Sequence, residues 1–206
     1  MIRIFIISLC LITSNCAYIS YNQVIPLARN AILGVEKIKV DDNLIESIDY
    51  SFARVNLGRS ASIIMILEKI DSQNNYHWIS SDSEKLITSN GKIIKTRDLI
   101  YNFEAINYLF NLESSAGYYD VMFYDPKAFI EQKFLIEEEE IEGNLKQYTE
   151  TIFNLPLKST WKNTYRVNDL DLVIYSKQKI HPNLPEIEMD IYCLLYTSDA
   201  ADELSC

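Results

Sequence analysis

The pattern of apolar and polar residues changes along the chain after Gly34. Between Tyr21 and Gly34, Pro26 lies near the start, good helix formers fill the middle and a glycine ends the segment. This arrangement predicts one short N-terminal helix. Beyond it, short apolar runs rich in β-branched and aromatic residues begin at Ile38, and such runs indicate β-strands.

The sequence predicts a β-hairpin around Asn90-Gly91. This pair lies between two β-prone runs, at residues 84–89 and 92–97. Asparagine and glycine readily adopt the two positive φ angles of a type I′ turn, which joins adjacent antiparallel strands. The hairpin is the clearest local structural signal in the chain.

Further β-prone runs follow the hairpin as far as Tyr192. They are separated by proline, glycine and asparagine, and lie at residues 118–124, 128–136, 146–153, 160–167, 172–179 and 186–192. Residues 99–112 fit either a helix or an irregular connection. Strands that recur roughly every ten residues without alternating helices predict a mainly all-β fold: a large antiparallel sheet curled into a barrel-like or sandwich domain.

The first fifteen residues have the layout of a signal peptide. Arg3 precedes an apolar run from Ile4 to Ile12, and small or polar residues lead from there to Cys16. A helix needs about 20 apolar residues to cross a bilayer, so this run is too short to remain as a membrane span. We expect residues 1–15 to be removed on export.

Cys16 is the predicted site of lipidation. The segment Leu11-Ile-Thr-Ser-Asn-Cys16 resembles the processing site of bacterial lipoproteins, where the cysteine receives acyl chains such as palmitate. Asn15 departs from that pattern, which usually has Gly, Ala or Ser before the cysteine. The alternative is ordinary cleavage near Cys16 or Ala17, which would leave a free thiol.

The C-terminal segment has a different origin from the rest of the chain. Cys193-Leu-Leu-Tyr-Thr-Ser-Asp-Ala-Ala-Asp-Glu203 matches a translated adapter used in DNA sequencing, so residues 193–206 are expected to be a non-native tail. Residues 16–192 then form a single β-rich domain. Cys16 is its one cysteine, so we expect no disulfide within it.

Charge and composition narrow the classes of partner and chemistry. The formal net charge of −10 disfavours nucleic acid as a partner. The acidic run Glu137–Glu140 is expected to be solvated, because consecutive side chains point in different directions and cannot converge on one ion. The two histidines, His77 and His181, lack the spacing of a zinc site. We therefore expect no metal and no cofactor.

The sequence also gives no positive sign of an enzyme. A Gly-x-Ser-x-Gly nucleophile motif and a glycine-rich phosphate loop are both missing from the 206 residues. A pair of carboxylates could still cleave a glycosidic bond, because their separation cannot be seen in a sequence. We predict a protein that is not an enzyme, with a glycan-cleaving enzyme as the weakest alternative.

Trp78 and Trp161 are candidate glycan-contact residues. Sugar rings stack on aromatic faces, and the chain also holds 14 tyrosines. The alternative is that both tryptophans pack in the core, since β-sheets are enriched in aromatic residues for that reason.

Several segments together resemble one known family. They are Ile48-Asp-Tyr-Ser-Phe-Ala-Arg-Val-Asn-Leu-Gly58, Trp78-Ile-Ser-Ser-Asp82 and the hairpin from Leu86 to Thr96, with weaker similarity at Trp161–Tyr165 and Pro185–Ile191. They are similar to the YjbF and GfcB group of outer-membrane lipoproteins, linked to exopolysaccharide or group 4 capsule production. Lys92 stands where many members have arginine.

This resemblance implies a β-rich protein held at the outer membrane of a Gram-negative cell by its N-terminal lipid, facing the periplasm. It implies a non-catalytic accessory role in the production or export of a polysaccharide, beside an outer-membrane β-barrel of the same secretion system. The polysaccharide itself is a second expected partner. The alternative is a periplasmic carrier or binding protein for an apolar or glycan ligand.

Overall fold

The computed structural model describes residues 38–99, 101–108, 111–141, 145–154 and 156–192. The predicted signal peptide, Cys16, the helix expected between Tyr21 and Gly34, and the predicted non-native tail from residue 193 onward lie outside the described residues. Within them, one helix and twelve strands follow in chain order: α3 (Asp42–Ser47), β1 (Phe52–Leu57), β2 (Ser62–Ile70), β3 (Asn75–Ser80), β4 (Lys85–Ser89), β5 (Lys92–Arg97), β6 (Phe103–Ile106), β7 (Ala116–Tyr124), β8 (Lys127–Ile141), β9 (Leu145–Asn154), β10 (Ser159–Val167), β11 (Val173–Gln178) and β12 (Ile187–Tyr192).

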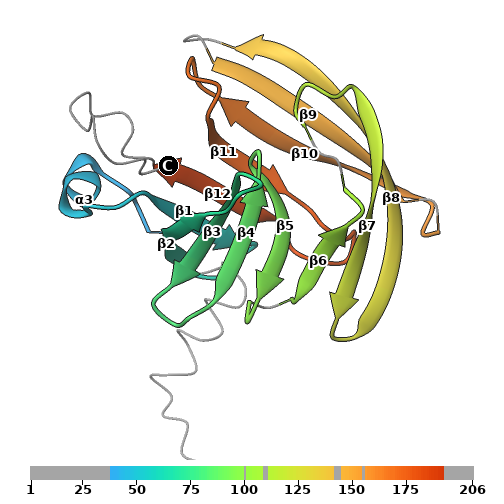
Figure 1. Ribbon diagram of the computed structural model, residues 1–206, viewed down its shortest axis with the longest axis horizontal. Coiled ribbons are helices and arrows are strands. Elements are labelled where there is room, and N and C mark those ends of the chain that lie inside the picture. The colour runs from blue at the N-terminus through green and yellow to red at the C-terminus, as the bar shows by residue number, and fades with distance from the viewer. Residues whose placement is uncertain (1–37, 100, 109–110, 142–144, 155, 193–206) are drawn as a thin grey trace, which may run out of the picture. The chain divides into compact units, whose positions relative to one another are not determined.

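The twelve strands form a closed antiparallel barrel (Figure 1). Each strand pairs with the strands before and after it in the sequence, and β1 closes the barrel by pairing with β12. This closing ladder runs from Phe52 opposite Tyr192 to Leu57 opposite Ile187. The prediction of an antiparallel all-β sheet is confirmed, and of its two forms the structure has the barrel.

The Asn90-Gly91 hairpin is present as predicted. β4 ends at Ser89, β5 begins at Lys92, and the two turn residues have φ angles of 46° and 76°. The remaining predicted strands correspond to β7 to β12, with ends that shift by a few residues. The largest shift is in β8, which continues to Ile141 and so includes the acidic run at its end.

Three segments differ from the sequence interpretation. The apolar run that begins at Ile38 does not start a strand, because the first strand, β1, begins at Phe52. The segment 99–112 contains the short strand β6, which joins β5 and β7 in the sheet. The helix α3 was also not foreseen. Asp41 caps it, because an Asp41 Oδ1 accepts a hydrogen bond from the backbone N–H of Leu44 at 2.9 Å.

Side chains alternate between the inside and the outside of the barrel, as the pleat of a strand requires. β10 illustrates this, because Trp161, Asn163, Tyr165 and Val167 are buried while the residues between them are half-buried or exposed. The inward-facing residues of most of the strands join in one apolar cluster. The space inside the barrel, here called the lumen, is therefore filled with packed side chains.

β5 and β11 contact each other across the lumen although they are not neighbours in the sheet. Gln178 on β11 donates from Nε2 to the backbone oxygen of Gly91 at 2.7 Å, and its Oε1 accepts from the N–H of Ile93 at 2.9 Å. Gly91 permits this approach, because a Cβ placed there would lie 2.5 Å from Val173 Cγ1. The contact ties the β4–β5 hairpin to the opposite wall.

One end of the barrel is closed by the loop between β11 and β12. Ile180 and Leu184 in this loop join the apolar cluster, which also contains Leu57, Leu99 and Phe103 at the same end. The space left among them is about 10 Å³, which is barely enough for one water molecule. A ligand of any size has no room at this end.

Candidate functional site

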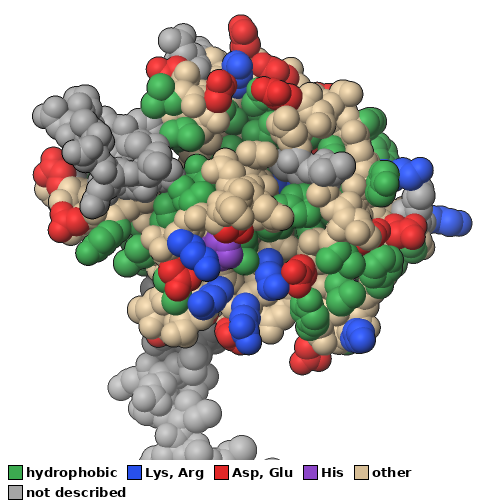
Figure 2. Space-filling view, viewed as in Figure 1, with side chains coloured by type: hydrophobic (Ala, Val, Ile, Leu, Met, Phe, Trp, Pro, Cys, Tyr) green, Lys and Arg blue, Asp and Glu red, His purple; other side chains and the backbone are tan. Residues whose placement is uncertain are grey.

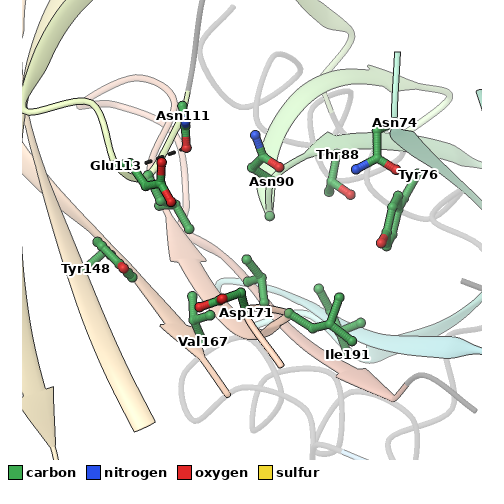
Figure 3. A pocket seen from close by; sticks show the side chains of 14 residues that line it. Asn74, Tyr76, Thr88, Asn90, Asn111, Glu113, Tyr148, Val167, Asp171 and Ile191 are labelled. Carbon is green, nitrogen blue, oxygen red and sulfur yellow. Dashed lines mark hydrogen bonds between the residues drawn. The ribbon is translucent and has the colours of Figure 1, made fainter. Parts of the chain in front are cut away.

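A cavity of about 240 Å³ lies at the other end of the barrel. We call this end the mouth; the turns β2–β3, β4–β5, β6–β7 and β10–β11 surround it (Figure 3). The polar side chains that line the cavity, besides Thr88, are Asn74, Tyr76, Asn90, Asn111, Glu113, Tyr148 and Asp171. Its apolar side is formed by Leu112, Val167, Leu172, Val173 and Ile191. The mouth cavity thus combines hydrogen-bonding groups with an apolar surface.

The geometry of the turns explains why amides and carboxylates line the mouth. Asn74, Asn90 and Asp171 have φ angles of 61°, 46° and 57°, a region that asparagine and aspartate tolerate better than other side-chain-bearing residues. Asn168 supports the β10–β11 turn, because its Oδ1 accepts from the N–H groups of Leu170 and Leu172 at 3.1 and 2.9 Å. The asparagine and aspartate residues that suit these tight turns therefore also supply polar groups to the cavity.

The electrostatic character of the mouth is acidic. Glu113 and Asp171 line the cavity, and Lys146 lies 3.7 Å from a carboxylate oxygen of Asp171. Figure 2 shows further acidic side chains at this end of the molecule, where β8, β9, β10 and β11 meet. Glu138 is among the exposed residues of β8 there.

Tyr148 keeps its phenolic proton at neutral pH. Burial raises its pKa above the ordinary value, and the charge of Glu138 raises it further. The hydroxyl can therefore both donate and accept a hydrogen bond.

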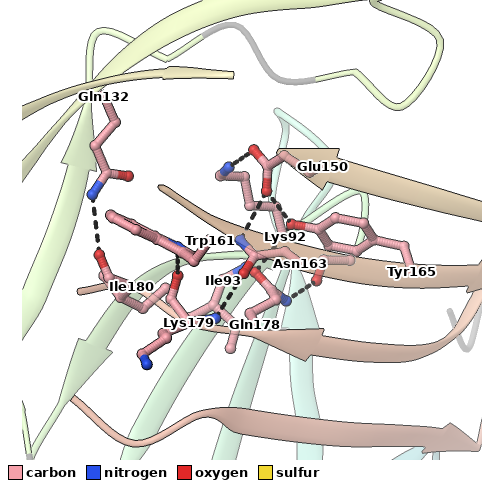
Figure 4. A network of polar contacts seen from close by, with 11 residues as sticks. Lys92, Ile93, Gln132, Glu150, Trp161, Asn163, Tyr165, Gln178, Lys179 and Ile180 are labelled. Atoms are coloured by element: carbon pink, nitrogen blue, oxygen red, sulfur yellow. Dashed lines mark hydrogen bonds and ion pairs between the residues drawn. The ribbon is translucent and has the colours of Figure 1, made fainter. Parts of the chain in front are cut away.

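A buried ion pair lies in the lumen, between Lys92 on β5 and Glu150 on β9 (Figure 4). Both side chains are almost fully buried, at 2% and 0% exposure. The second oxygen of Glu150 accepts from Asn163 Nδ2 at 2.9 Å and from the hydroxyl of Tyr165 at 2.8 Å. Lys92 Nζ also lies 3.9 Å from the centre of the Tyr119 ring.

Burial shifts the pKa values of several groups in this network. It lowers the pKa of Lys92, while Glu150 acts in the opposite direction. It raises the pKa values of Tyr119 and Tyr165 well above 10.0, and the charge of Glu150 raises them further. Both oxygens of Glu150 are engaged, so the network holds β5, β9 and β10 together and leaves no oxygen of this carboxylate free for a substrate.

The structure places both predicted glycan-contact residues in the core. Trp78 is 1% exposed and donates from its indole nitrogen to Thr88 Oγ1 at 3.0 Å. Trp161 is 9% exposed and donates to the backbone oxygen of Lys179 at 2.6 Å. Their burial favours the packing alternative, because neither indole presents a free face on which a sugar could stack.

The other residues examined in the sequence lie apart from one another. His77 Nε2 lies 3.0 Å from Asp71 Oδ2 beside the β2–β3 turn, whereas the ring of His181 lies against Phe123. Glu137 to Glu140 are all exposed on β8. Among the described residues, no group of three or more His, Cys, Asp or Glu side chains is arranged to hold a metal ion. In the same part of the chain, no helix has the length and apolar character to cross a membrane.

The mouth cavity and the buried network were not foreseen from the sequence. Of the residues that form them, Asn90 and Gly91 were singled out, and then for their turn conformation alone. Lys92 was noted as a departure from the related family. In the sequence, Lys92 directly follows the hairpin glycine and begins the second strand of the hairpin. A charged residue at this position was the one available signal for the network.

The sequence and the structure each match proteins described as lipoproteins. Residues 27–117 match the family described as group 4 capsule polysaccharide lipoprotein GfcB, YjbF. An uncharacterised lipoprotein of Escherichia coli K12, GfcB, is 28% identical over 92 residues, which span 45% of this chain and 42% of that relative. The alignment thus covers less than half of the relative's length.

The crystal structure of a hypothetical lipoprotein, YmcC from E. coli K12, matches with a TM-score of 0.64. The match covers 84% of this chain and 95% of that one at 20% identity, so it establishes the shared fold alone. By its sequence over residues 27–117, the chain resembles the YjbF and GfcB family of group 4 capsule lipoproteins, as expected from the sequence.

Proposed function

We propose that the protein is an outer-membrane lipoprotein that acts as a non-catalytic accessory factor in the production or export of a capsule polysaccharide. The description of the related family names group 4 capsule polysaccharide. In this proposal the signal peptide directs export, Cys16 carries the lipid, and the barrel domain faces the periplasm. Its partners are the polysaccharide and an outer-membrane β-barrel of the same system.

The packed lumen is the observation that carries the non-catalytic contact role. The apolar cluster and the Lys92–Glu150 network fill the space inside the barrel, and one end is closed by Ile180 and Leu184. A carrier for an apolar ligand would need an open lumen lined by apolar side chains. The packing therefore favours contacts at the mouth and the outer surface over storage of an apolar ligand inside.

A deletion and complementation experiment tests this function. We expect loss of the gene to reduce cell-surface polysaccharide, and a plasmid copy of the intact gene to restore it. The amount is measured by extraction of surface glycans and gel staining. Unchanged polysaccharide in the deletion strain would show that the proposed role is wrong.

The lipid anchor needs its own test, with a matched control. Cys16→Ser removes the acyl acceptor, so we expect the exported protein to move from the membrane fraction to the soluble periplasmic fraction. Cys10→Ser changes another cysteine, inside the predicted signal peptide, and should leave the distribution unchanged. Membrane association that persists in Cys16→Ser would exclude Cys16 as the anchor.

Cleavage of the polysaccharide is the competing enzymatic function. Incubation of the purified chain with the isolated polysaccharide, followed by measurement of reducing ends, distinguishes the two. We expect no release of reducing ends above that of the heat-denatured protein.

A further inference from the structure

We propose that the mouth cavity binds one or two units of a neutral glycan chain. This inference deepens the proposed function and rests on it for the origin of the ligand. The cavity is lined by amide, carboxylate and phenol groups, and its other side is apolar. Neither the sequence nor the related proteins assigned any residue of the lining a role in ligand binding.

The lining matches the two kinds of surface that a sugar ring presents. Ring hydroxyls both donate and accept hydrogen bonds, and Asn90, Asn111 and Glu113 offer partners of both kinds. The C–H face of a ring needs an apolar surface, which Val173 and Ile191 supply. Figure 3 shows Asn90, Asn111, Glu113 and Ile191 around one open space.

The size of the cavity limits what it can hold. Pockets for drug-sized ligands span about 300–1,000 Å³, and the mouth cavity, at about 240 Å³, is smaller. The lumen below the cavity is filled with side chains, so a long acyl chain has no path from the cavity into the barrel. A short stretch of a longer glycan can enter an open mouth while the rest of the chain remains in solvent.

Charge selects among glycans. Glu113 and Asp171 line the cavity, and none of its lining residues is a lysine, arginine or histidine. A uronic acid or a phosphorylated sugar would bring a like charge close to these carboxylates, and the nearby cation, Lys146, already pairs with Asp171. An apolar ligand would displace water from the polar lining without offering hydrogen bonds in return. A neutral hydroxylated ligand avoids both costs.

The cavity is also held in place before any ligand arrives. Gly91, between Asn90 and the buried Lys92, is tied to β11 through Gln178, with Nε2 of Gln178 2.7 Å from the Gly91 oxygen. The facing wall carries Val173, packed closely against the position of Gly91. A site that needs little rearrangement loses less entropy when it binds.

Binding is tested with the full chain purified in detergent and three probes. The first is a set of neutral trisaccharides built from glucose, galactose or N-acetylglucosamine; the second is trigalacturonate; the third is laurate. Saturation-transfer NMR detects contact, and titration calorimetry gives the affinity. We expect at least one neutral trisaccharide to bind, and trigalacturonate and laurate not to bind.

Variants locate the site. Glu113→Gln and Asp171→Asn keep the shape of each side chain and, for Asp171, a residue type that tolerates a positive φ. We expect each variant to lower the affinity for the neutral sugar by about five- to tenfold, because each replaces a charged hydrogen-bond acceptor by a neutral one. Asp82→Asn, in the β3–β4 turn at the opposite end, is the matched control and should leave the affinity unchanged.

Each remaining outcome overturns the inference. Binding of laurate or trigalacturonate in preference to every neutral sugar would do so, as would the absence of binding by all three probes. Neutral-sugar binding that neither mouth variant weakens would place the site elsewhere. The gene-deletion experiment separates this failure from that of the proposed function, because it measures polysaccharide in cells and does not depend on these probes.

Discussion

At the scale of single residues, disruption of the Lys92–Glu150 pair should lower the stability of the fold more than disruption of any other ion pair described above. Both groups are almost fully buried. Removing one partner of such a pair leaves an uncompensated charge in the interior, which typically costs about 3–5 kcal/mol. We therefore expect Lys92→Met to lower the free energy of unfolding by about this amount, measured by urea denaturation of the full chain.

A second pair provides the control. Lys85 and Glu68 lie 3.7 Å apart with side-chain exposures of 44% and 41%, so Lys85→Met should change the stability by less than about 1 kcal/mol. The double variant Lys92→Met with Glu150→Gln should recover part of the loss, since it removes the orphaned charge. Equal effects of Lys92→Met and Lys85→Met would contradict the burial of the first pair.

At the scale of elements, the β4–β5 hairpin depends on the glycine in its turn. Gly91 has a φ of 76°, and a Cβ there would lie within 3 Å of three side-chain atoms of Val173. Gly91→Ala therefore combines backbone strain with overpacking, and we expect it to cost at least about 2 kcal/mol. Thermal denaturation followed by circular dichroism measures the effect.

Two further variants separate backbone strain from overpacking against Val173. Asn90 also has a positive φ, of 46°, and Asn90→Gly should be close to neutral because glycine adopts this conformation without strain. The double variant Gly91→Ala with Val173→Ala relieves the clash but keeps the strained φ. Failure of the double variant to recover any stability would show that close approach to β11 does not limit residue 91.

The contribution of the β2–β3 turn to the stability of the fold depends on pH. The hydrogen bond with His77 is the main cause that holds the pKa of Asp71 well below its usual range, followed by the N–H of Asn75. A depressed carboxyl pKa stabilises the fold above the unfolded value of 3.8, and this contribution disappears as the pH falls below it. We expect Asp71→Asn to lower the stability at pH 7 and to flatten the decline between pH 4 and 2, measured as melting temperature. An unchanged acid decline would contradict this role.

Most of the elements could be predicted because each is encoded locally. The alternation of apolar residues defines β7 and β10, and the Asn90-Gly91 pair alone defines the turn between β4 and β5. β6 was missed because its four residues are too few to show a period. The capping residue Asp41 was a usable signal for α3, but the helix has only six residues and little apolar pattern.

At the scale of the whole molecule, features that join distant parts of the chain could not be predicted. The choice between barrel and sandwich depends on the ladder between β1 and β12, which pairs Phe52 with Tyr192. The mouth cavity is assembled from four turns, and the buried network joins Lys92 to Glu150 across 58 positions of sequence. No spacing in the sequence specifies either, because both arise only when the barrel closes.

Closure also determines how the chain should respond to truncation at its C-terminal end. β12 pairs with β1 on one side and with β11 on the other, and the ladder with β1 ends at Tyr192. A chain that stops at Tyr192 keeps every described strand pair, so its melting temperature should match that of the full chain. A chain that stops at Glu186 lacks β12 and exposes the edges of β1 and β11, and exposed edges promote aggregation. We expect the shorter chain to aggregate during purification, as measured by size-exclusion chromatography with light scattering. A monomeric, cooperatively melting protein without β12 would mean that barrel closure is not required for the fold.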